Sequence, residues 1–207
     1  MKLFSTEGPF YKFMMQFMDL LTINILWILC SMPIITIGAS TAAACSVTMK
    51  MAKDEEGYIA RQFFKAFKQN WKQGTILGFL MALVAYAFYL DTQILKAASD
   101  LSYLVIVMTF GLAIVYVLCF TYAFALIARY ENTIKNTIQN SIKITFRYFG
   151  RTLAMLFSLA LIYIVLSFNA IMLFFLILIG PGCLFYTYGF FCRGIFEKIE
   201  KDQESGL

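Results

Sequence analysis

The chain has 207 residues, of which 61% are hydrophobic and only 14% are charged, and its formal net charge is +5. A soluble globular protein is about 45–50% apolar and about 25% charged, so this composition excludes an ordinary soluble domain. The mean hydropathy of +0.75 agrees with that exclusion. Most of the apolar residues lie in four stretches without any charge: Leu20–Met49, Gln73–Leu90, Leu101–Ala128 and Thr152–Cys192. Because a spanning helix needs about 20 mostly apolar residues, we predict an all-α, polytopic membrane protein, with residues 1–207 forming a single integral membrane domain.

The segment SMPIITIGAS, residues 31–40, interrupts the first uncharged stretch, which is 30 residues long. A single helix of that length would measure about 45 Å, against a bilayer core of about 30 Å. Pro33 disfavours helix just before it, Gly38 permits a turn conformation, and Thr36 can cap the next helix. We therefore predict a structural turn at Pro33, Thr36 and Gly38 between two spans. A single crossing here, with five spans in total and the N-terminus outside, is the alternative.

The final uncharged stretch of 41 residues needs a similar break. Either Asn169 or Gly180-Pro181-Gly182 can supply it, and the second site is favoured because proline at a helix start and flanking glycines are typical of turns. With both breaks the chain has six spans. These form three hairpins, at about residues 10–53, 58–130 and 134–200.

Positive charge is concentrated between the uncharged stretches. Residues 50–72 hold six Lys and Arg, and residues 129–151 hold five, whereas residues 91–100 hold one lysine between two aspartates. Because basic loops stay in the cytoplasm, we expect 50–72, 129–151 and the C-terminus inside and 91–100 outside. The few charges before residue 20 favour a cytoplasmic N-terminus as well. The predicted location is the cell membrane, with multiple spans.

Both basic segments have the pattern of amphipathic helices. An aromatic residue recurs every four positions from Phe63 to Trp71, and an apolar residue does so from Ile134 to Phe146, with cations on other faces. Such helices can lie in the headgroup layer. We expect amphipathic cytoplasmic connecting helices that contact the anionic membrane surface or a partner protein; plain extensions of the spans are the alternative. The contact residues would be Arg61, Lys65, Lys68, Lys72, Lys135, Lys143, Arg147 and Arg151.

No reaction chemistry is expected from the residue types. The chain has no histidine, so it lacks Ser–His pairs, Cys–His pairs and the HExxH motif. Its five cysteines form no CxxC pair and lie in the uncharged stretches. We therefore predict no enzyme and no catalytic, cofactor-binding or metal-binding residue. Polar residues inside spans are costly and often functional, so Asp19 and Asn24 are candidates for an intramembrane polar site, with an interhelical hydrogen bond as the alternative.

Three motifs near the N-terminus suggest a family. They are Gly8-Pro9, then DLLTINILWILCSMPIITIGAS beginning at Asp19, then FFKAFKQNWKQ beginning at Phe63. With these motifs the chain resembles the YesL-like family of bacterial integral membrane proteins, a domain of unknown function. The resemblance is specific over roughly residues 4–75 and continues beyond them as a hydrophobic pattern.

The resemblance implies a role near carbohydrate uptake or its sensing, because members of the family tend to be encoded beside sugar-uptake transporters and sugar-responsive two-component systems. It implies no reaction. We expect a non-enzymatic accessory or regulatory partner whose contacts are the lipid bilayer and either sugar transporter subunits or a sensor kinase, and no nucleic acid. The alternative is a small solute transporter or channel that acts alone as a homo-oligomer, with the break after Pro33 lining a polar cavity.

Overall fold

The computed structural model describes residues 9–53, 57–97 and 103–205, and every regular element in those ranges is a helix. The predicted outer connection therefore lies partly outside the described residues. The elements in chain order are α1 (Pro9–Ser31), the 3-10 helix η1 (Ile34–Thr36), α2 (Ile37–Met51), α3 (Ile59–Ala97), α4 (Tyr103–Phe120), α5 (Ala123–Arg129), α6 (Ile134–Arg147), α7 (Phe149–Leu166) and α8 (Ala170–Glu204).

Six helical segments are long and apolar enough to cross a bilayer within the part of the chain that is described. Two of them, Phe10–Ser31 and Ile34–Met51, lie on either side of the predicted turn after Pro33. The others come from α3, from α4 with α5, from α7 and from α8. The predicted all-α membrane class with six spans is confirmed.

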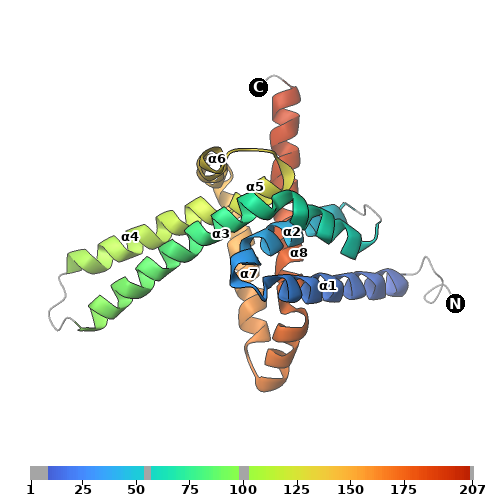
Figure 1. Cartoon of the computed structure of the whole chain (residues 1–207), viewed down its shortest axis with the longest axis horizontal. Coiled ribbons are helices and arrows are strands. Elements are labelled where there is room, and N and C mark those ends of the chain that lie inside the picture. The colour runs from blue at the N-terminus through green and yellow to red at the C-terminus, as the bar shows by residue number, and fades with distance from the viewer. Residues whose placement is uncertain (1–8, 54–56, 98–102, 206–207) are drawn as a thin grey trace.

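Helix α2 lies at the centre of the molecule, and three arms lead away from it (Figure 1). One arm is α1, the second is the hairpin of α3 and α4, and the third is α7 with the first part of α8. The C-terminal part of α8 and α6 lie on the side opposite the third arm. In its spanning window α2 is 72% buried, whereas the windows of α1, α3 and α7 are 11% buried. The arms therefore leave most of their apolar surface uncovered.

Glycines bring the backbones of α2 and α3 into contact. A Cβ atom on Gly38 would lie 2.0 Å from the carbonyl oxygen of Gly74, and one on Gly74 would lie 2.7 Å from the Cα of Ala39. Small residues allow such close helix packing inside membranes. Gly38 itself lies in the first turn of α2. It therefore serves this close approach, and not the turn conformation that we predicted for it.

The turn between α1 and α2 depends on Pro33 and Thr36. Pro33 is extended, with φ −74° and ψ 111°. The Thr36 hydroxyl lies 2.5 Å from the carbonyl oxygen of Cys30 and 2.7 Å from that of Pro33, and it can donate to either. The last carbonyls of a helix have no partner within the helix, so a side-chain donor at this place closes the end of α1.

The break in the last uncharged stretch lies at Asn169, and the prediction that favoured Gly180-Pro181-Gly182 is wrong. Asn169 is extended, and its Oδ1 accepts a hydrogen bond from the backbone N–H of Met172 at 2.9 Å, so it caps α8. Helix α8 continues through Pro181. Gly182 permits close packing instead, because a Cβ there would lie 2.7 Å from the carbonyl oxygen of Leu20 in α1.

The two basic segments differ in structure. Residues 59–72 are the first part of α3, which is one helix of 39 residues. The separate connecting helix that we expected there is absent, and the alternative, an extension of the span, is correct. The second segment contains a separate helix, α6. Its buried face consists largely of hydroxyl side chains, those of Thr137, Ser141 and Thr145.

Two of these hydroxyls, those of Ser141 and Thr145, bond to a break between α4 and α5 that the sequence did not indicate. Ser141 Oγ accepts a hydrogen bond from the Tyr122 N–H at 3.1 Å and donates to the Leu118 carbonyl at 3.2 Å. The Tyr188 hydroxyl of α8 donates to the Thr121 carbonyl at 2.8 Å. An irregular backbone at membrane depth is tolerated where protein groups satisfy it, as these side chains do.

Candidate functional site

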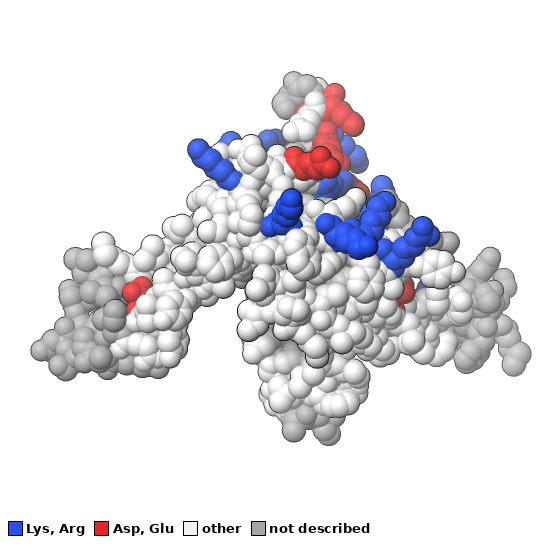
Figure 2. Space-filling view, in the orientation of Figure 1, with Lys and Arg blue, Asp and Glu red and all other residues white. Residues whose placement is uncertain are grey.

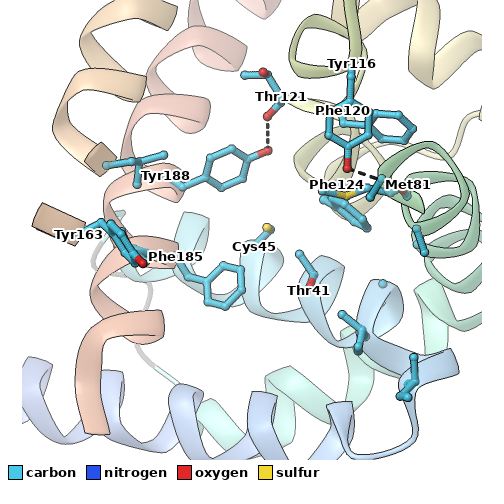
Figure 3. A pocket seen from close by; sticks show the side chains of 18 residues that line it. Thr41, Cys45, Met81, Tyr116, Phe120, Thr121, Phe124, Tyr163, Phe185 and Tyr188 are labelled. Carbon is cyan, nitrogen blue, oxygen red and sulfur yellow. Dashed lines mark hydrogen bonds between the residues drawn. The ribbon is translucent and has the colours of Figure 1, made fainter. Parts of the chain in front are cut away.

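A groove of about 630 Å³ lies between the second and third arms, with α2 as its floor. Thr41 and Cys45 of α2 face it from the floor, and Met81 and Tyr116 come from the second arm (Figure 3). Tyr163 of the third arm stands on the opposite wall and is 57% exposed. The groove is therefore lined by residues from six α-helices, α2 to α5, α7 and α8, that are far apart in the sequence.

Three of the polar side chains that line this groove, Tyr188, Tyr116 and Thr41, are hydrogen-bonded within the protein. The hydroxyl of Tyr188 donates to the Thr121 carbonyl, and the hydroxyl of Tyr116 donates to the Met81 carbonyl at 3.4 Å. Thr41 Oγ1 accepts a hydrogen bond from the indole N–H of Trp27 at 3.2 Å. No charged side chain is among the described residues that line the groove. Its surface thus suits apolar groups such as side chains of another membrane helix or lipid tails.

Within the described residues, no group of three or more Cys, Asp or Glu lies close enough together to hold a metal ion. The cysteines are free, and Cys45 and Cys192 are buried. The described geometry therefore offers no assembled metal centre beside the groove.

Asn24, one of the two predicted intramembrane polar residues, bonds α1 to α8. Its side chain is 1% exposed, and its Nδ2 donates to the carbonyl oxygens of Ile177 at 3.1 Å and Leu178 at 2.5 Å. Pro181 has no N–H, so the Ile177 carbonyl, four residues earlier, lacks its helical donor. Asn24 supplies that donor from the neighbouring helix. This is the interhelical hydrogen bond that we kept as the alternative for this residue.

Asp19, the other predicted residue, lies on α1 away from Asn24. Five residues separate them, which is about 140° around a helix. The Asp19 carboxylate is half-buried and makes no ion pair or side-chain hydrogen bond in the described part of the chain. The structure therefore does not bring the two residues into one polar site.

The predicted surface cations gather where the arms meet, as Figure 2 shows for the face in view, whereas the arms are almost free of charge. All eight are exposed. Arg147 pairs with Asp202 at 3.1 Å, and Arg151 donates to the carbonyl of Gly194 at 3.0 Å. The four on α3 have no ion pair within the described residues. We call these four, Arg61, Lys65, Lys68 and Lys72, the α3 cation row.

A polar pocket of about 800 Å³ adjoins the α3 cation row. Lys68 and Lys72 line it from α3, and Arg129 and Glu131 line it from the end of α5 and the residues after it. Gln73 closes one side by donating to the Asn132 carbonyl at 2.9 Å. The pocket is therefore lined by charged side chains, whereas the groove is lined by uncharged ones.

Comparisons with known proteins agree with the motifs described above. Residues 20–92 match the family model described as "Protein of unknown function, DUF624". The chain is also 27% identical over 143 residues to "Uncharacterized protein YesL" of Bacillus subtilis (strain 168), an alignment that covers 67% of each chain. The predicted resemblance to the YesL-like family is confirmed. No solved structure matches the chain.

Segment 20–92, which matches the family model, contains the close contact between α2 and α3. It includes the second half of α1, the turn with Pro33 and Thr36, all of α2 and α3 as far as Thr92. The glycine contacts of Gly38 and the α3 cation row both lie inside it. Asp19 lies just before the matched segment, and α4 to α8 follow it.

Besides the α4–α5 break, sequence reasoning missed two features that bear on function. One is the groove, which forms only when the arms are placed. The other is an acidic patch at the end of α8, where Glu200 accepts two hydrogen bonds from Arg129, at 2.8 and 3.1 Å, and one from Tyr130 at 2.6 Å. Asp202 bonds to Arg147. The alternation of acidic residues in the basic tail was the available signal, and it did not reveal their partners.

Proposed function

We propose that this chain is a non-enzymatic accessory or regulatory subunit of the bacterial cell membrane that works beside a protein of carbohydrate uptake or sensing. In this proposal the helices of the partner pack against the arms and fill the apolar groove between them. The partner is a sugar transporter subunit or a sensor kinase.

The uncovered arms are the observation that carries the proposal. Apolar helix faces in lipid gain little by covering one another, so they stay available to lipid or to helices of another protein. The spanning windows of α1, α3 and α7 are only 11% buried. The groove has no charged side chain among its described lining residues, and its Tyr188 hydroxyl is bonded within the protein. Apolar side chains of a partner could therefore pack in it without hydrogen-bonding groups of their own.

The carbohydrate part of the proposal rests on the YesL-like resemblance, since the groove itself carries no sugar chemistry. The orientation rests on charge. Basic residues near the ends of spans stay in the cytoplasm, so the end with the α3 cation row and the C-terminal part of α8 would lie inside the cell. The polar pocket beside that row would then face cytoplasmic parts of the partner.

The rival function, a solute transporter or channel that acts alone as a homo-oligomer, has weaker support. A site for a polar solute needs a few convergent polar groups. Two polar side chains at membrane depth are bonded within the protein: the Asn24 amide to α8, and the Tyr188 hydroxyl to the α4–α5 break. The groove that Ile34, Ile37 and Gly38 line beside the turn after Pro33 has no charged side chain among its described lining residues.

The test is isolation of the tagged chain from its native membrane in mild detergent, with quantitative mass spectrometry of the proteins that remain bound. We expect transporter subunits or a sensor kinase in fixed ratio to the chain. In parallel, the purified chain in liposomes should take up no sugar. Uptake by the chain alone, with no other protein in the isolate, would overturn the proposal in favour of the transporter.

A further inference from the structure

Asp19 is an intramembrane carboxylate with no partner among the described residues. It lies nine residues after Phe10 and twelve before Ser31, which places it about 14 and 18 Å from the two ends of this span. Its side chain has no ion pair and no hydrogen bond in the described part of the chain. Charged residues inside spans are costly, and they almost always face the bundle interior and pair there with an opposite charge or a polar group. Asp19 lacks such a group among the residues that the structure describes.

The carboxylate belongs to a polar stripe along the first half of α1. Lys12, Gln16 and Asp19 lie within about 60° of one another around the helix. Lys12 and Gln16 are exposed. We call these three residues the α1 polar stripe.

The α1 polar stripe continues the packed face of the same helix. Ile23, one turn after Asp19, is fully buried and packs in a cluster with Val47 and Phe63. Residues four apart lie on the same face of a helix. The α1 polar stripe therefore lies on the same face of α1 as Ile23, but no described helix of this chain packs against Lys12 and Gln16. A group that packs against the stripe would continue the helix–helix interface of Ile23, so we expect that group to be another helix.

A second copy of the chain does not fit this position. If two α1 helices met across a two-fold axis near Asp19, like charges would come together. The other spans of a copy offer no cation at that depth, because the uncharged stretches contain no lysine or arginine. Lys12 lies seven residues earlier, about 10 Å along the axis, which is beyond ion-pair distance. Lipid tails do not fit either, because three polar side chains would face hydrocarbon. A helix with a cation at the matching depth satisfies the carboxylate.

We propose that the α1 polar stripe is a docking site for a transmembrane helix of another protein that carries a lysine or arginine at the depth of Asp19. This names the class of partner and so rests on the proposed accessory function. The cation pairs with the Asp19 carboxylate, and Gln16 hydrogen-bonds to the same helix.

The test uses the full chain in phosphatidylcholine vesicles and a synthetic leucine-rich spanning peptide with a single central lysine. Binding is read by energy transfer between a dye on the chain and one on the peptide. We expect the lysine peptide to bind about tenfold more tightly than the same peptide with leucine at that position, because interhelical polar contacts in bilayers have this magnitude. A peptide with glutamate there should bind no better than the leucine peptide.

Two variants separate the site from general charge effects. Asp19→Asn keeps the shape of the side chain and should reduce the preference for lysine to less than twofold. Asp91→Asn, which removes the carboxylate near the far end of α3, should leave the preference unchanged. Equal binding of the lysine and leucine peptides by the natural chain would overturn the proposal, as would equal losses in both variants. Because no native partner is used, a failure here is distinct from a failure of the isolation experiment.

Discussion

Pro181 and Asn24 form a matched pair across two helices. A proline inside a helix removes one backbone donor and leaves a carbonyl without its partner. The amide of Asn24 donates to that carbonyl, on Ile177, from α1. This is how α8 continues unbroken through Gly180-Pro181-Gly182, where composition alone indicated a turn.

Replacing Asn24 should therefore destabilise the fold in a way that depends on Pro181. We expect Asn24→Leu to lower the free energy of unfolding by about 1–2 kcal/mol, the size of interhelical hydrogen bonds in membranes. In a Pro181→Ala background the helix regains its own donor, so the same change should cost less than half as much. Equilibrium unfolding in detergent measures both. An equal cost in the two backgrounds would contradict the pairing.

Replacing Gly38 should lower the stability of the protein strongly, even when only one methyl group is added. Gly38→Ala adds a Cβ that would lie 2.0 Å from a backbone oxygen of α3, so the two helices must separate. We expect a loss of roughly 1–3 kcal/mol, as for overpacked cores. Gly111→Ala is the control, because nothing lies within 4 Å of that position. Thermal unfolding of the two variants should differ clearly; similar midpoints would refute the contact.

At the scale of the helix, α6 stabilises a break in another element. The hydroxyl of Ser141 replaces the bond that Tyr122 N–H would otherwise make within a continuous α4–α5 helix. We expect Ser141→Ala to cost about 1–3 kcal/mol, because it leaves a buried donor unsatisfied. It should also speed hydrogen exchange at the Tyr122 amide. Ser158→Ala is the control, since that hydroxyl is exposed and bonds only to its own helix; unchanged exchange in Ser141→Ala would count against this role.

The α3 cation row should respond to lipid charge. The residues are exposed and have no acidic partner among those described, so anionic headgroups near them should stabilise the protein by about 1 kcal/mol per cation. Changing Lys65, Lys68 and Lys72 to Glu should abolish the rise in thermal stability that anionic nanodiscs give over neutral ones. The same three changes to Arg should keep it. A triple Glu variant that gains as much as the natural chain would exclude this contact.

The sequence predicted helices and turns correctly where neighbouring residues in the sequence determine them. Charge-free length predicted the spans, and Pro33 with Thr36 predicted the turn. The break at Asn169 was placed wrongly because the outcome depended on contacts between helices: Gly182 meets α1, and Asn24 satisfies the carbonyl opposite Pro181. Likewise, the hydroxyls on α6 give a polar pattern whose purpose is visible only beside the α4–α5 break.

At the scale of the whole molecule, the uncovered apolar surface of the arms is the basis of the function that we propose. The exposure of the four cations on α3 followed from the sequence, whereas the cytoplasmic side that loop charge predicts for them stays a prediction. The groove was not predictable, since its lining residues extend from Ile34 to Tyr188 and meet only after α2 has packed against α3. The uncovered arms, the apolar groove and the absence of a partner for Asp19 among the described residues are the observations behind our proposal that this chain packs against another protein.

Site-specific photo-crosslinking in living cells tests this claim most directly. A photoreactive phenylalanine derivative at Tyr163 faces the groove, and one at Phe157, on the same helix but outside the groove lining, is the control. We predict that light yields one dominant adduct from position 163 with a different membrane protein, a sugar transporter subunit or a sensor kinase, and little from position 157. Adducts only with a second copy of the chain, or no protein adduct at position 163, would contradict the account.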